Sequence, residues 1–108
     1  MPANDINRWM TSLLDHLQLS RQRQLVALQG SESWCDEQLQ RLFALDESMQ
    51  LVSDRKISAT AVPLEKADAC LGSEARLVVM DLFNGFNPDV LCIVAGLVRA
   101  GGVLLLLS

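Results

Sequence analysis

Hydrophobic positions along the chain follow two kinds of pattern. From Asp5 to Leu19, apolar side chains recur every three or four residues, which places them on one stripe of an amphipathic helix. Two later segments, 76–81 and 103–107, are apolar without alternation, as is typical of strands that are covered on both faces. The chain therefore combines helices that bury one face with strands that bury two.

The segment between these two strands predicts a helix that joins them. Asn87 is suited to cap its first turn, and Pro88 fits the first helical position, where its missing N–H costs nothing. The apolar run continues to Ala100, and Gly101 is expected to end the helix. Strand, helix and strand in this order form a parallel β-α-β unit, whose crossover is expected to be right-handed.

The rest of the chain alternates in the same way. The pattern predicts a strand over 24–29, a helix over 33–45, a weaker strand over 49–52 and a short helix from Pro63 to a glycine cap at Gly72. This alternation predicts a small Rossmann-like α/β domain with three layers. Its sheet should be mostly parallel, with about four strands and helices on both faces.

A length of 108 residues suits a single domain, with an N-terminal helix over 1–20 and the sheet with its crossover helices over 23–108. A doubly wound domain normally continues with a loop and a helix after a buried strand such as the last one. We therefore expect the chain to be a fragment of a larger multidomain protein. The alternative is a small natural protein that ends on its sheet.

Composition narrows the classes of function. Half of the residues are hydrophobic and 20% are charged, which is typical of a globular domain. The formal net charge of -4 disfavours a free-standing nucleic-acid binder, because an acidic surface repels phosphate backbones. A local basic patch stays open, because three arginines lie in the first quarter of the chain: Arg8, Arg21 and Arg23.

The three cysteines are widely spaced and form no CxxC pair, which disfavours a zinc site. No signal-peptide pattern is visible, and the longest apolar run, 103–107, is far too short to span a membrane. We therefore expect a cytoplasmic protein, with reduced and mostly buried thiols at Cys35, Cys70 and Cys92.

Candidate chemistry is confined to the carboxyl ends of the strands, where parallel sheets bind their ligands. The turn from Gly30 to Ser33 enters a helix, but it lacks both the dinucleotide glycine spacing and the Gly-Lys-Ser/Thr of a P-loop. Asp81 is expected to cap the following loop rather than bind a ribose or metal, because no second acid or histidine is near it. His16, the only histidine, has no nucleophile or acid assigned to it by spacing.

Two stretches resemble a known family. The first, 23–35, is a strand followed by Gly30 and then by Trp34 and Cys35. The second, 79–107, has Asp81, a Gly-Phe pair, a helix that ends Ala-Gly and a leucine-rich strand. In this order, these features are similar to the N-terminal domain of the bacterial tRNA(Met) cytidine acetyltransferases. Each piece alone is generic, but the set covers about residues 13–108.

The resemblance implies a large cytoplasmic enzyme that acetylates N4 of the wobble cytidine of elongator methionine tRNA. This domain would precede a helicase-like P-loop module that uses ATP and Mg²⁺ and an acetyltransferase module that uses acetyl-CoA. No motif of those modules is present, so the resemblance assigns no catalytic, cofactor-binding or metal residue to this segment. Residues that match the family pattern are expected to be structural or to line a docking surface: Gly30, Trp34, Cys35, Asp81, Gly85 and Phe86.

The role implied by the resemblance is non-catalytic. The domain would dock on the helicase-like and acetyltransferase modules of its own chain, would meet tRNA through the parent protein and would have no membrane contact. Two other functions remain open on the residues alone. One is a small-molecule or nucleotide-binding module that uses the loops after the first and third strands. The other is a free-standing protein-interaction domain.

Overall fold

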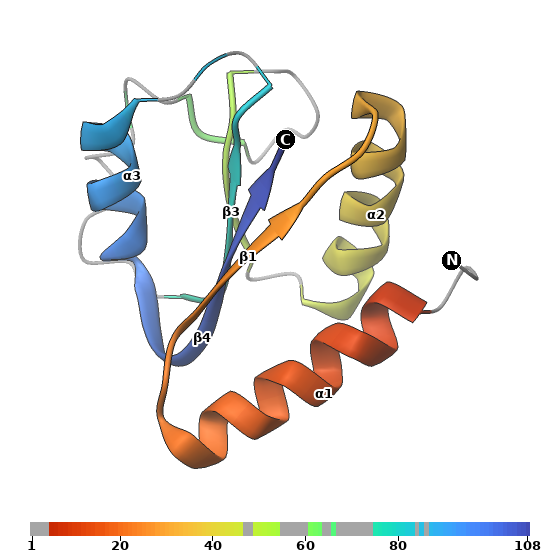
Figure 1. Ribbon diagram of the computed structural model, residues 1–108, viewed down its shortest axis with the longest axis vertical. Coiled ribbons are helices and arrows are strands. Elements are labelled where there is room, and N and C mark those ends of the chain that lie inside the picture. The colour runs from red at the N-terminus through yellow and green to blue at the C-terminus, as the bar shows by residue number, and fades with distance from the viewer. Residues whose placement is uncertain are drawn as a thin grey trace.

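The computed structural model is a parallel sheet between two layers of helices (Figure 1). The residues it describes are 5–46, 49–54, 61–63, 66, 75–83, 85 and 87–108. In chain order the elements are α1 (Asp5–Ser20), β1 (Gln24–Leu28), α2 (Glu32–Leu45), β2 (Gln50–Val52), β3 (Ala75–Asp81), α3 (Pro88–Ala95) and β4 (Val98–Leu107).

The sheet has four strands in the order β1-β4-β3-β2, and all three pairings are parallel. The two strongest strands of the sequence, β3 and β4, lie at its centre. The prediction of a small α/β domain with a parallel sheet of about four strands is therefore confirmed. The short helix predicted from Pro63 to Gly72 falls mainly outside the described residues.

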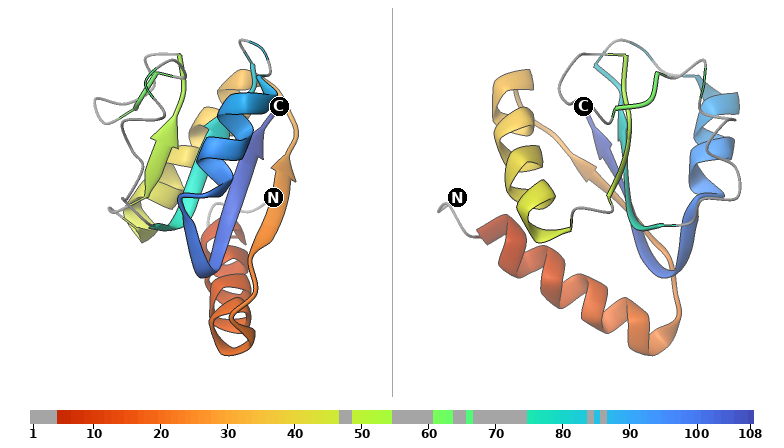
Figure 2. Two further views of the ribbon diagram at one scale, coloured as in Figure 1. Left: turned by 90° about the vertical axis from the view of Figure 1, so that its left-hand side faces the viewer. Right: turned by 180° about the vertical axis from the view of Figure 1, so that it is seen from behind.

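The helices cover both faces of the sheet, as Figure 2 shows from two further directions. One face carries Leu77, Val79 and Leu105 into a core with α1 and α2. The opposite face carries Val78 and Met80 into a second core with α3. Because successive side chains of a strand point to opposite faces, the unalternated apolar runs of β3 and β4 supply both cores.

α1 buries the stripe that the sequence predicts. Ile6, Met10, Leu14 and Leu17 are each at most 3% exposed. The helix lies across the lower end of the sheet in Figure 1, against the start of β4. It ends at Ser20, and Arg21 takes a φ of +55°, so that the chain turns into β1.

The helix after Asn87 is shorter than the sequence predicts. α3 stops at Ala95 rather than Ala100, and β4 begins at Val98 instead of near residue 103. Leu97 and Val98 are buried, as the apolar pattern requires, but they pair with the start of β3: Ala75 N–H donates to the Leu97 carbonyl at 2.9 Å. Strand hydrogen bonds to β3 thus replace the last helical turn.

Gly101 therefore lies inside β4 and does not end a helix. Two steps along β3, from Ala75 to Leu77, correspond to five along β4, from Val98 to Val103. The extra residues form a bulge, where Gly101 has a φ of +85°. The bulge bends β4 towards the end of α1.

The two edges of the sheet differ. On the outer side of β2, the Val62 N–H donates to the Leu51 carbonyl at 2.8 Å and the Ser53 N–H donates to the Val62 carbonyl at 2.9 Å. At the opposite edge, β1 pairs with β4 on its inner side. Among the described residues, no strand pairs with its outer side.

Candidate docking site

The turn after β1 is tied to the end of β4. The Ser108 N–H donates to the Leu28 carbonyl and the Gly30 N–H donates to the Ser108 carbonyl, each at 3.1 Å. Ser31 then caps α2, because its Oγ accepts the N–H of Trp34 at 3.2 Å. This is the ordinary capped turn that the sequence favours over a phosphate site.

The indole ring of Trp34 packs over Gly30. A Cβ added at Gly30 would lie 2.5 Å from Cε3 of Trp34, closer than any real contact. Glycine is needed here because the ring occupies the space that a side chain would take. The two family-pattern residues therefore act as one structural pair in this chain.

Replacing Gly30 with alanine is expected to lower the free energy of unfolding by about 1 kcal/mol, because the Trp34 ring must move aside. Chemical denaturation followed by far-ultraviolet circular dichroism measures this loss. In the Trp34→Ala background the same substitution is expected to cost less than about 0.3 kcal/mol. An equal cost in both backgrounds would rule out the ring as the cause.

Two cysteines fall in the described part of the chain, and they differ in burial. Cys35 is fully buried and its thiol donates to the Leu28 carbonyl at 3.7 Å, which confirms a core role. Cys92 is exposed, so the prediction that it is buried is wrong. α3 buries Val90 and Val94 against the sheet, and Cys92 lies between them in sequence on another side of the helix. Cys70 lies outside the described residues.

Asp81 is 2% exposed and holds two parts of the carboxyl edge together. Its Oδ2 accepts the hydroxyl of Ser53 at 2.7 Å, and its Oδ1 accepts the N–H of Phe83 at 2.8 Å. The loop then closes when the Gly85 N–H donates to the Leu82 carbonyl at 3.1 Å. Asp81 therefore caps this loop, as the sequence favours.

The structure brings Gly30, Trp34 and Cys35 together after β1, whereas Asp81 and Gly85 lie in the separate loop after β3. Phe86 lies outside the described residues. The role of these residues in docking stays a prediction. Within the described ranges, no three His, Cys, Asp or Glu side chains gather to hold a metal ion.

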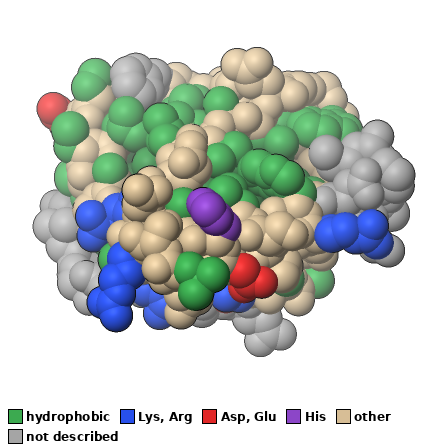
Figure 3. All heavy atoms as spheres, turned by 60° about the horizontal axis from the view of Figure 1, so that its bottom comes forward, with side chains coloured by type: hydrophobic (Ala, Val, Ile, Leu, Met, Phe, Trp, Pro, Cys, Tyr) green, Lys and Arg blue, Asp and Glu red, His purple; other side chains and the backbone are tan. Residues whose placement is uncertain are grey.

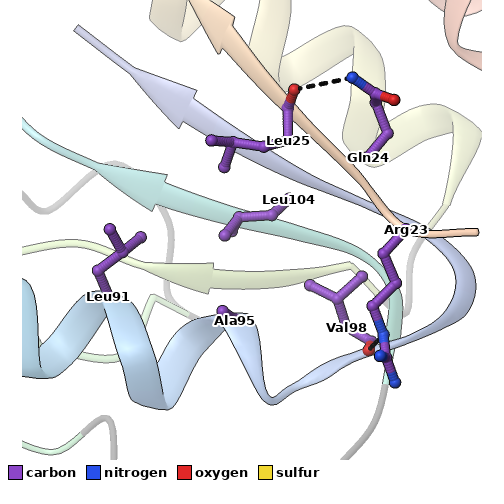
Figure 4. A pocket seen from close by; sticks show the side chains of 7 residues that line it. All are labelled: Arg23, Gln24, Leu25, Leu91, Ala95, Val98 and Leu104. Atoms are coloured by element: carbon purple, nitrogen blue, oxygen red, sulfur yellow. Dashed lines mark hydrogen bonds between the residues drawn. The ribbon is translucent and has the colours of Figure 1, made fainter.

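A concave surface lies elsewhere, between β1 and α3 (Figure 4). This α3 groove has a volume of about 350 Å³. It is lined by Arg23, Gln24, Leu25, Leu91, Ala95, Val98 and Leu104. In Figure 4, Leu25, Leu91 and Leu104 lie around the groove and Arg23 lies at one end of it.

Polar groups at the rim of the α3 groove already bond to backbone. The Arg23 Nε–H donates to the Val98 carbonyl at 2.7 Å, and the Gln24 amide donates to the Leu25 carbonyl at 3.2 Å. Leu25, by contrast, is 57% exposed at the groove wall. The groove therefore offers mainly an apolar surface with one cation at its end.

A second hollow, of about 230 Å³, lies on the other side of β1. We call it the α1 hollow; it is lined by Ile6, Trp9, Val26, Ala27 and Leu28. Trp9 is 45% exposed there. Figure 3 views the molecule from the side of α1: a broad hydrophobic area lies next to the purple His16, with Lys and Arg side chains at its margins.

Both hollows flank the same strand, so the outer edge of β1 has apolar surface on each face. This site was not predicted from the sequence. The available signal was the run Leu25–Leu28, which is apolar without alternation, as in a strand with two covered faces. In the structure, its burial pattern is instead that of a half-exposed edge.

Fold and site together define a small parallel α/β domain with an open apolar edge at β1. A family model described as tRNA(Met) cytidine acetyltransferase TmcA, N-terminal, matches residues 1–108. The chain belongs to this family, as the sequence resemblance implies.

Three curated relatives, each described as tRNA(Met) cytidine acetyltransferase TmcA, are similar to the chain. The protein from Nitrosococcus halophilus is 30% identical over 97% of the chain, and that from Photorhabdus asymbiotica is 34% identical over 91%. The protein from Pectobacterium atrosepticum is 32% identical over 79% of the chain. The matched parts span 14%, 14% and 12% of these relatives, so each relative is several times longer than the match.

Within the described ranges, no helix has both the length and the apolar character needed to cross a membrane. α1 is the longest of them, with 16 residues, and its exposed face carries charged side chains such as Arg8 and Asp15.

Proposed function

We propose that this chain is a non-catalytic docking domain of a tRNA(Met) cytidine acetyltransferase. In the parent enzyme, which we place in the cytoplasm, helicase-like and acetyltransferase modules would use ATP with Mg²⁺ and acetyl-CoA to acetylate N4 of the wobble cytidine. The observation that carries the proposal is the family match over the whole chain, together with the open apolar edge at β1.

The physical argument concerns the exposed apolar surface. The side chains of Trp9 and Leu25 are both exposed to water. Leu25 lies on one face of β1, and Trp9, on α1, lies beside the other face. Such surfaces mark places where another polypeptide packs, and domain interfaces within one chain are of this kind. Removing Leu25 from water would favour association, since buried apolar surface contributes about 25 cal/mol per Å².

Direct RNA binding by this domain has less support. The formal net charge is -4, and Arg23 uses one of its donors on the Val98 carbonyl inside the domain. Because RNA backbones repel an acidic surface, we assign the tRNA contacts to other modules of the parent. The domain would then support RNA binding through the modules that it positions.

The second candidate function is binding of a small molecule in the α3 groove. The volume of about 350 Å³ favours it, since ligand pockets start near this size. However, ligand pockets also contain several convergent polar groups, and this groove has Arg23 and Gln24 at its rim alone. A thermal-shift screen with nucleotides tests this candidate, because tight binding raises the melting temperature.

Deleting residues 1–108 from the full-length parent is expected to lower acetyl transfer to tRNA(Met) at least about tenfold, because the modules lose a fixed contact. The measurement is acetyl incorporation from labelled acetyl-CoA with ATP. Circular dichroism of the truncated enzyme verifies that the remainder is folded. The separate 108-residue chain is expected to transfer no acetyl group. Full activity of a folded truncated enzyme would exclude an essential docking role.

A further inference from the structure

The two described crossovers of the sheet constrain how the chain would continue. The step from β1 to β2 runs across the sheet in one direction with α2 on one face. The step from β3 to β4 runs in the opposite direction with α3 on the other face. The two crossovers differ both in their direction across the sheet and in the face that carries their helix. When both are reversed, the handedness of a crossover stays the same, as the right-handed rule requires.

A further crossover from β4 to an added strand is therefore constrained in its direction and in the face that its helix covers. The outer edge of β1 is open, and reaching it from β4 continues in the direction of the step from β3 to β4. The same handedness then places the connecting helix on the face of α3, above β4 and β1. That position is the α3 groove, whose walls come from β1, β4 and α3.

We propose that, in the full-length protein, the segment directly after this domain forms a helix that fills the α3 groove and then a strand that pairs with the outer edge of β1. The proposal rests on the proposed function for the existence of a longer parent, in line with relatives of which the match spans 14%. The occupant is thus a neighbouring part of the same polypeptide, and the domain would dock on the following modules through this helix and strand.

The lining of the groove agrees with such a helix. Leu25, Leu91 and Leu104 present apolar walls to the apolar stripe of a helix, and Ala95 leaves room for close approach to α3. A crossover helix runs antiparallel to the strands, so its last turn would lie at their amino ends. Arg23 precedes β1 at that end, and its charge complements the carbonyls of a helix C-terminus.

The added strand would also account for the sequence of β1. Leu25–Leu28 is apolar on both sides, which is typical of an inner strand, although β1 is an edge among the described elements. If β1 had a partner strand on its outer side, the helix in the α3 groove would cover Leu25. The α1 hollow beside Trp9 would then border the new strand. An exposed apolar edge strand would otherwise invite aggregation.

The backbone of β1 provides a sharp test. The Leu28 carbonyl accepts from Ser108 of the chain segment that continues β4, so Leu28 and Val26 direct their backbone groups towards β4. Because these groups alternate along a strand, the amides of Leu25 and Ala27 point to the outer edge. These two amides report on an added strand, and their neighbours serve as internal controls.

Hydrogen exchange is measured at these four amides in the full-length parent. We expect Leu25 and Ala27 to exchange within about tenfold of the rates of Val26 and Leu28, as inner-strand amides do. Exchange at Leu25 and Ala27 near the rate of an unprotected peptide would overturn the added strand. This result would leave the docking function intact, so the two proposals fail separately.

Photocrosslinking in the full-length parent identifies the occupant of the groove. A photoreactive phenylalanine at Leu25 is expected to crosslink to the same polypeptide within about 40 residues after residue 108, the length of a helix and a strand. The control places the same group at Cys92, which is exposed on α3 outside the groove lining, and is expected to give no such product. Crosslinks to a second copy, to a distant module or to no polypeptide would each refute the proposed helix.

Discussion

Replacing Gly102 with alanine is expected to lower the free energy of unfolding by about 3 kcal/mol. A Cβ at this position would lie 2.7 Å from the carbonyl oxygen of Arg76 and 2.9 Å from that of Arg99. Both atoms belong to the backbone at the bulge where β4 passes β3, so neither can move without disturbing strand pairing. The loss is a large share of the roughly 5–15 kcal/mol that stabilises a typical domain.

Urea denaturation of the 108-residue chain, followed by tryptophan fluorescence, measures this change. The matched control is Gly96→Ala, because Gly96 has an ordinary φ of -70° and the nearest atom to its added Cβ, the Ile93 carbonyl oxygen, would lie 3.3 Å away rather than 2.7 Å. We expect the free energy of unfolding of the control to stay within about 0.5 kcal/mol of that of the unsubstituted 108-residue chain. If Gly102→Ala were as stable as the control, the close approach of the two backbones would be wrong.

Asp81→Ala is expected to cost about 2 kcal/mol, the next largest effect. The substitution removes the acceptor for the Ser53 hydroxyl and for the Phe83 N–H in a site that is 2% exposed. A buried donor that loses its acceptor still has the free-energy cost of leaving water, and no hydrogen bond offsets that cost. The same denaturation experiment measures the loss, and thermal unfolding is expected to shift downwards by several degrees.

The control for Asp81 is the isosteric change to asparagine. Its side-chain oxygen still accepts the Phe83 N–H and its amide donates to the Ser53 hydroxyl, so we expect a loss below about 1 kcal/mol. In the parent enzyme, Asp81→Asn is expected to leave acetyl transfer unchanged. A large loss of activity with normal stability would instead assign Asp81 a direct chemical role.

Local pattern was sufficient for most of the elements. The stripe of α1 and the unalternated runs of β3 and β4 are local features, since the period of apolar residues reports how many faces an element buries. The caps at Ser31 and Asn87 are local as well, because each side chain bonds to backbone two or three residues away. These features determine an α/β domain.

The boundary between α3 and β4 could not be obtained in this way. Leu97 and Val98 suit a helix and a strand equally well on the basis of their hydrophobicity. Pairing with Ala75, more than twenty residues earlier, selects the strand. The prediction that Cys92 is buried was wrong for a related reason. Which side of a helix meets the sheet depends on how long the helix is and where the sheet lies.

The sequence alone determined the class of the domain, its parallel β-α-β unit and, through its family-pattern residues, its kinship with the TmcA N-terminal domain. Only the tertiary structure decided the strand order β1-β4-β3-β2, and with it the place of β1 at an open edge. Strand order depends on contacts between residues far apart in the chain, which no local period records. The apolar run Leu25–Leu28 looks internal by sequence and lies at the edge in space, and this difference defines the candidate docking site.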